Sequence, residues 1–151
     1  MSTSEPQPSF PLPSRITLVT LGVADVAVST QFYERLGWTK SSVSNDNITF
    51  FHSAGTVLAI FGRAALAEDA QAECTSPGFS GITLAQNFSS EAEVDAAFRH
   101  AILSGAKAMK QPQKVFWGGF SGYFADPDGH LWELAYNPYA ELDVSGNMVL
   151  P

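Results

Sequence analysis

One carboxylate lies in the middle of an apolar, strand-like run near the C-terminal end of the chain. The run is HLWELAY, residues 130–136, and it follows directly on the tight turn Asp126-Pro127-Asp128-Gly129. Strand alternation places Glu133 on one face and the bulkier Trp132 and Leu134 on the other. A carboxylate on an apolar face can take a proton from a bound carbon acid or hold a cationic ligand. Alternatively, hydrogen bonds satisfy it and it only shapes a cavity.

A second candidate stretch is VFWGGFSGY, residues 115–123, in which glycines and aromatic residues are interleaved. Glycine permits backbone geometry that bulkier residues block. One interpretation is a bulged edge strand whose aromatic residues belong to the core. The other is a flexible aromatic wall that stacks on a planar or cationic ligand, with Trp117 as its main contact.

The three histidines, His52, His100 and His130, suggest structural or solvent-exposed positions rather than a reactive cluster. His130 is out of phase with Glu133 and is therefore expected on the opposite face, where it supports the turn beside Asp126.

Residues 15–66 have the pattern of a β-α-β-β-β unit. The segment ITLVTLGV, residues 16–23, predicts a strand. Asp25 is placed to cap a helix in which Val28, Phe32 and Leu36 recur every four residues, and Gly37 is placed to end it. Three short strands are expected to follow, at SSV (residues 41–43), NITFF (residues 47–51) and TVLAIF (residues 56–61).

The same order of elements returns in residues 80–140, after a connector at residues 67–79. ITL, residues 16–18, recurs at residues 82–84. Ser90 and Glu93 form a capping box for a second helix, and strand-like AKAMKQ, FSGYFA and HLWELAY complete the unit. The sequence therefore predicts an α+β fold of two tandem β-α-β-β-β units, preceded by a disordered arm at residues 1–14 and followed by a tail at residues 141–151.

Composition and charge narrow the class of protein. The chain has 151 residues, which is most simply one domain. Its formal net charge of -7 disfavours nucleic acid and anionic membranes as partners. The single cysteine, Cys74, excludes an internal disulfide and fits a reducing compartment. With no signal-peptide pattern at the N-terminus, we expect a cytoplasmic protein.

The segments LGVADVAVSTQFYERLGW, residues 21–38, and YFADPDGHLWELAYNP, residues 123–138, carry a resemblance to a known family. They resemble the glyoxalase, bleomycin-resistance and extradiol-dioxygenase group, the vicinal oxygen chelate superfamily, over roughly residues 15–140. The resemblance implies a glyoxalase-like fold in which each unit contributes a curled sheet and two units enclose a cup. It also implies a homodimer. It does not fix the reaction, because one fold serves many functions.

The resemblance also implies where a metal would bind. Members of the superfamily that use a metal take its ligands from the first and last strand of each unit. Those positions fall here at Leu18 and Ile82 on the first strands and at Ala59 and Glu133 on the last. Only Glu133 can coordinate a divalent cation, whereas a metal site needs several converging donors. We therefore expect no metal and no other cofactor.

The cup is expected to bind a small organic molecule without a metal, with lyase or isomerase chemistry that moves a proton at Glu133. An alternative is a protein that sequesters a drug or metabolite, as the bleomycin-resistance branch does, since an acidic protein with an aromatic wall suits a cationic planar ligand. A second alternative is a metal-dependent glyoxalase or dioxygenase. The first strand of the second unit is expected to turn Ile82, Leu84 and Gln86 towards Glu133. The residues expected to contact the ligand are Trp117, Phe120, Tyr123, Thr20, Gln86 and Phe61.

Overall fold

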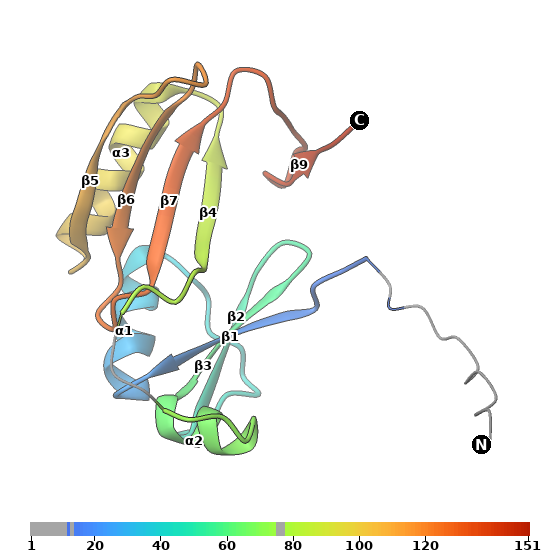
Figure 1. Ribbon diagram of the computed structural model, residues 1–151, viewed down its shortest axis with the longest axis vertical. Helices are drawn as coiled ribbons and strands as arrows, with labels where there is room; N and C mark the ends of the chain where they lie inside the picture. Colours follow the sequence, from blue (N-terminus) through green and yellow to red (C-terminus); the bar gives the residue numbers. More distant parts are fainter. Residues whose placement is uncertain (1–11, 13, 75–77) are drawn as a thin grey trace, which may run out of the picture.

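The protein consists of two halves, each a β-sheet with one long helix packed on one face (Figure 1). The computed structural model describes residues 12, 14–74 and 78–151. Most of the expected arm at residues 1–14 and part of the expected connector therefore lie outside the described residues. The α+β class and the tandem order of elements are confirmed. None of the helices in the described part of the chain is long and apolar enough to cross a membrane.

The first half is a sheet in the order β1-β3-β2 with β1 and β3 parallel. Its elements are β1 (Leu18–Val23), α1 (Val26–Leu36), β2 (Ile48–His52) and β3 (Val57–Gly62), followed by α2 (Arg63–Asp69). The strand expected at residues 41–43 is wrong, since only an isolated bridge joins Lys40 to Phe51. The hydroxyl of Ser44 accepts from the Phe50 N–H at 2.9 Å and so replaces part of a strand ladder with a turn.

Helix α1 begins and ends at the residues that the sequence predicts. The Asp25 side chain accepts from the Val28 N–H, and Gly37 ends the helix with a φ of 114°. Phe32 and Tyr33 are fully buried, whereas Val28, which the repeat places on the buried face, is 50% exposed. Buried positions that recur every three to four residues include both Phe32 and Tyr33, whereas a strict four-residue repeat includes only Phe32.

The second half is a four-stranded sheet in the order β4-β7-β6-β5, with β4 parallel to β7. Its elements are β4 (Thr83–Phe88), α3 (Glu91–Leu103), β5 (Lys107–Lys114), β6 (Phe120–Ala125) and β7 (Leu131–Tyr136). The predicted capping box starts α3: the Glu93 N–H donates to the Ser90 hydroxyl, and the Glu93 carboxylate accepts from the Ser89 N–H. The expected C-terminal tail instead contains a small hairpin, β8 (Glu141–Leu142) and β9 (Met148–Val149).

The strand pairing shows how the two halves correspond. Leu18 pairs with Val57 in the first half, and Thr83 pairs with Leu131 in the second. The last strands of the two halves, β3 and β7, are aligned through the glycine in the turn before each of them. In this alignment Leu18 matches Thr83 rather than Leu84. The repeated letters ITL are thus one residue out of register, and a one-residue shift exchanges the two faces of a strand.

A buried hydrogen-bond network joins the halves at the turn before β7. The Tyr33 hydroxyl donates to Asp126 Oδ2 at 2.6 Å and accepts from the Trp132 indole at 3.1 Å. Asp126 Oδ1 accepts from the backbone N–H groups of Asp128 and His130. One carboxylate therefore shapes its own turn and at the same time holds α1 of the other half.

The next carboxylate in the turn extends this junction. Asp128 accepts from the Ala24 N–H at 2.8 Å and from the Ser29 hydroxyl at 2.7 Å. The ring of His130 makes a 2.8 Å hydrogen bond with the carbonyl of Gly22 in β1. The expected structural role of His130 is therefore confirmed, and it includes a link between the halves.

We expect this junction to weaken at alkaline pH. Burial, followed by the charge and hydrogen bond of Asp126, raises the pKa of Tyr33. Because the unfolded chain ionises first, the stabilisation is complete below about pH 10 and is lost above it, at about 1.4 kcal/mol per pH unit. Urea unfolding across that range should show a flatter pH dependence in Tyr33→Phe than in the natural protein. Identical slopes would show that Tyr33 does not control the alkaline limit.

Candidate functional site

Glu133 lies in the middle of the second sheet, on the face turned away from α3. It pairs with Tyr123 of β6 on one side and with Ala85 of β4 on the other. The neighbours of Glu133 in β7, Trp132 and Leu134, are 5% and 2% exposed and belong to the core under α3. The predicted alternation of this strand is confirmed. We call the face that carries Glu133 the open face of the second sheet.

Small side chains surround Glu133 on this open face. Ala135 follows it along β7, Ser121 pairs with Ala135 across the ladder, and Ala85 lies beside it on the edge strand. Ala135 and Ser121 are buried, whereas Glu133 itself is half-buried. The carboxylate therefore stands among short side chains.

Tyr123 is the polar partner of Glu133. Its pKa is raised by burial, and further by the charge of Glu133 and a hydrogen bond with it. The phenol therefore stays protonated at neutral pH and can donate a hydrogen bond. Lys110 pairs with Tyr123 on β5 and continues the row as an exposed residue. A base, a neutral donor and a cation thus follow one another across the sheet.

Trp117 lies in the turn between β5 and β6, which Val115 and Gly119 close through a backbone hydrogen bond of 3.0 Å. A Cβ atom placed on Gly119 would meet the indole of Trp117 at 1.8 Å. Gly119 directly precedes β6, so the ring lies at the start of that strand. Trp117 is 37% exposed there.

Two of the expected contact residues lie on the other face. Gln86 pairs with Leu134 and Phe120 pairs with Tyr136, both on the side that faces α3. The expected position of Gln86 beside Glu133 is wrong because the first strand is shifted by one residue, and Ala85 takes that place. Phe120 packs against the core instead of standing in the aromatic wall.

Thr20 and Phe61 belong to the first sheet. Thr20 pairs with Ala59, and Phe61 pairs with Gly22, on the face away from α1. Both side chains are half-buried. The structure therefore divides the expected contact residues between two sheets, and within the described residues no hydrogen bond or ring contact joins Thr20 or Phe61 to Glu133.

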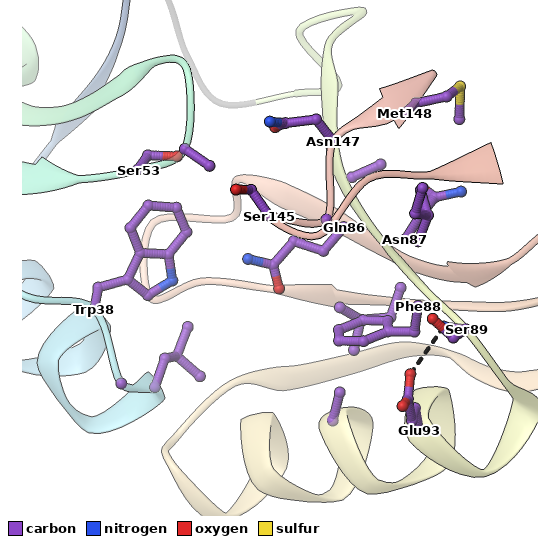
Figure 2. Close-up of a pocket in the computed structure, with 18 of the residues that line it drawn as sticks. Trp38, Ser53, Gln86, Asn87, Phe88, Ser89, Glu93, Ser145, Asn147 and Met148 are labelled. Carbon is purple, nitrogen blue, oxygen red and sulfur yellow. Dashed lines mark hydrogen bonds between the residues drawn. The ribbon is translucent and has the colours of Figure 1, made fainter. Parts of the chain in front are cut away.

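A separate cavity of about 1120 Å³ lies between the halves, and Gln86 lines it (Figure 2). Its walls come from the end of α1, the turn between β2 and β3, β4, α3 and the C-terminal hairpin. Glu133 and Tyr123 do not line it. Sequence reasoning missed this cavity because its walls are far apart in the chain and no local pattern marks them.

The sequence from residue 15 to residue 134 matches the family model of the Glyoxalase/Bleomycin resistance protein/Dioxygenase superfamily. The chain belongs to this superfamily. A glyoxalase-related enzyme from Fulvimarina pelagi is 33% identical, with a TM-score of 0.82 over 91% of this chain and 99% of that chain. A comparison with curated proteins gave no match.

Two further solved structures are similar. A glyoxalase/bleomycin resistance protein/dioxygenase from Nocardioides is 27% identical, with a TM-score of 0.69 over 85% of each chain. A lactoylglutathione lyase from Agrobacterium tumefaciens is 21% identical, with a TM-score of 0.62 over 83% of this chain and 95% of that chain. The latter likeness concerns the fold alone. The superfamily membership and the glyoxalase-like fold expected from the sequence are thus confirmed.

The residues present do not fit the metal site that the superfamily implies. With the corrected register, the first-strand positions carry Leu18, Thr20, Thr83 and Ala85, and the last-strand positions carry Ala59 and Glu133. Hydroxyl groups are poor ligands beside a single carboxylate. No group of three or more His, Cys, Asp or Glu side chains with metal-binding geometry occurs in the described part of the chain. A second copy would add only the same residue types at these positions.

We accordingly expect the purified protein to hold no stoichiometric divalent metal, because one carboxylate without converging donors binds such ions weakly. The measurement is elemental analysis after dialysis, with Glu133→Gln analysed in parallel. Close to one zinc, nickel, iron or manganese per chain in the natural protein, lost in Glu133→Gln, would contradict this expectation and restore metal-dependent chemistry.

Proposed function

We propose that the protein binds a small organic molecule on the open face of the second sheet and moves a proton on it, as a lyase or isomerase without a bound metal. The observation that carries this proposal is the pairing of the half-buried Glu133 with the protonated Tyr123 among small side chains. Membership of the superfamily and the likeness to a glyoxalase-related enzyme support it.

The chemistry requires a base and a hydrogen-bond donor at one place. The Glu133 carboxylate takes a proton from a carbon next to a carbonyl group, and the electron pair of that C–H bond moves onto the carbonyl oxygen. The Tyr123 phenol donates to this oxygen as its negative charge develops. Where the deprotonated carbon carries a hydroxyl group, the product is an enediolate, and return of the proton to the former carbonyl carbon, with transfer of the hydroxyl proton to the original carbonyl oxygen, completes an isomerisation. Where the carbon on the other side carries a leaving group, the electron pair expels that group and completes an elimination. Neither path needs an oxidant.

Proton exchange in ²H₂O tests this proposal without knowledge of the substrate. Carbonyl compounds with an acidic α-hydrogen are incubated with the protein, and ¹H NMR follows the loss of the α-proton signal. We expect at least one class of compound to exchange faster than in buffer and to do so in proportion to protein concentration. Exchange at the buffer rate across the whole panel would refute the proton-transfer role.

A sequestering protein of the bleomycin-resistance type is the second candidate, and the position of Trp117 favours it. The indole lies over Gly119 at the start of β6, the strand that carries Tyr123, and Phe116 beside it is fully exposed. An aromatic ring together with the Glu133 charge suits a planar cation. Titration with planar cationic dyes should then quench tryptophan fluorescence, with weaker binding in Trp117→Phe. Equal affinity of the variant would remove Trp117 from the site.

We also propose a homodimer. The edge strands β1 and β4 carry exposed apolar residues at or just before their starts: Ile16 is 67%, Leu18 is 43% and Ile82 is 66% exposed. Uncovered strand edges and apolar groups favour association, and two-fold pairing is the commonest arrangement of identical chains. Light scattering at tens of micromolar should give twice the 16.2 kDa of one chain. A mass of 16.2 kDa would contradict the dimer.

A further inference from the structure

The cavity between the halves, lined by Trp38, Gln86, Asn87 and Phe88 among others, has the features of a second binding site. We call it the inter-half cavity. Its volume of about 1120 Å³ is slightly above the range typical of small-molecule sites. Gln86 lies on the α3 side of the second sheet, opposite Glu133. Ala85 of the edge strand also lines the cavity, whereas Glu133 and Tyr123 do not.

Trp38 gives the inter-half cavity a rigid aromatic wall. Its ring packs edge-on against Tyr33, Phe51 and Trp132 with centroid distances of 5.8 to 6.3 Å. Three such contacts fix the orientation of the ring, and a fixed ring loses little conformational entropy when a ligand stacks on it. Figure 2 shows the nitrogen-bearing edge of this indole turned towards Gln86. Phe88, half-buried, adds a second aromatic surface.

Neutral hydrogen-bonding groups project beside these rings. Gln86 is exposed on β4 on the side of Trp38, and Asn87, half-buried, lines the cavity from the opposite face of the same strand. Neither amide, nor the Trp38 indole N–H, makes a hydrogen bond with any other described residue. Each amide offers both a donor and an acceptor, and the indole offers a donor. These groups are therefore available to a ligand that presents donors and acceptors at the edge of a ring.

The charged groups around the inter-half cavity are already engaged within the protein. Glu93 accepts from the Ser89 N–H at 2.8 Å, and Asp143 accepts from the backbone N–H groups of Ser145 and Asn147 at 2.9 Å. His100 bonds to the Leu36 carbonyl at 3.1 Å. No lysine or arginine is among the lining residues, all of which are described. His52, which also lines the cavity, is the one remaining lining side chain that can carry a positive charge.

From these features we infer that the inter-half cavity binds an uncharged, planar heteroaromatic molecule that carries amide-type donors and acceptors, such as a lactam or a carboxamide. The ring stacks beside Trp38, and its polar edge bonds to the Gln86 amide. This inference is independent of the proton-transfer proposal, because it uses neither Glu133 nor Tyr123.

Matched pairs of probes test both the site and its preference for neutral ligands. Uracil is compared with orotate, and nicotinamide with nicotinate, since each pair differs by one negative charge on a similar ring. Saturation-transfer NMR with the full chain should detect the neutral member of at least one pair and give at least tenfold weaker binding for its anion. Absence of binding by both neutral probes, or equal binding of the anions, would overturn the inference.

Variants locate the binding. Gln86→Leu removes the amide group, keeps a side chain of similar size and changes an exposed position. It should weaken the binding of the neutral probe about tenfold. Gln31→Leu, on the exposed side of α1, is the matched control and should leave affinity unchanged. Glu133→Gln should also leave it unchanged, which separates this site from the open face. Unaltered affinity in Gln86→Leu, or a loss in Glu133→Gln as large as in Gln86→Leu, would overturn the assignment.

Discussion

Proton exchange on a responsive carbonyl compound is expected to slow by about 10²- to 10⁴-fold in Glu133→Gln, the range that a positioned general base contributes. Glutamine keeps the size of the side chain and can still bond to Tyr123, but it cannot accept the substrate proton. Substrate affinity should change much less than the rate, since the surrounding short side chains and Trp117 remain. The measurement is initial exchange rate against substrate concentration by ¹H NMR.

Two further variants make this result specific. Glu68→Gln, exposed on α2, removes the same charge elsewhere and should leave the exchange rate unaltered. Tyr123→Phe should slow exchange by a smaller factor than Glu133→Gln, because it removes the hydrogen-bond donor and leaves the base. An exchange rate in Glu133→Gln equal to that of the natural protein would reduce Glu133 to a structural residue of the sheet.

Asp126→Ala should lower the free energy of unfolding by about 3–5 kcal/mol, the largest stability effect that we expect of any single substitution here. The variant leaves the buried Tyr33 hydroxyl without its acceptor and frees the N–H groups of Asp128 and His130. For a chain of this size the melting temperature should fall by roughly 10 °C. Differential scanning calorimetry and urea unfolding would both measure it.

The control for Asp126→Ala is Asp69→Ala, at the exposed end of α2, for which we expect a change within about 0.5 kcal/mol. Tyr33→Phe should fall between the two, because it removes one hydrogen bond and leaves the backbone bonds of the turn intact. If Asp126→Ala matched Asp69→Ala in stability, the network between the halves would not be what holds them together.

Local signals in the sequence were sufficient for the helices. Asp25 and Ser90 start α1 and α3 because the side-chain oxygen of each accepts a hydrogen bond from a free backbone N–H group in the first turn. Gly37 ends α1 because it adopts a positive φ without strain. The alternation around Glu133 is equally local, since a strand turns successive residues to opposite faces. These features depend only on neighbours within a few residues.

The register of the parallel strands was not available from the sequence. Whether Ala85 or Gln86 stands beside Glu133 depends on a one-residue shift between β4 and β7, which are more than forty residues apart. The letters ITL favoured the wrong shift. Both alternatives place a short or polar side chain on each face, so the hydrophobic pattern of this edge strand does not choose between them.

The sequence by itself determined the superfamily, the two tandem units, the ends of the helices and the face on which Glu133 stands, because each follows from local patterns or from extended motifs. Only the tertiary structure decided the pairing of Glu133 with Tyr123, the network of Tyr33 with Asp126, and the cavity beside Trp38 and Gln86. These contacts join residues from different elements, and their geometry depends on how the sheets and helices pack rather than on any one segment.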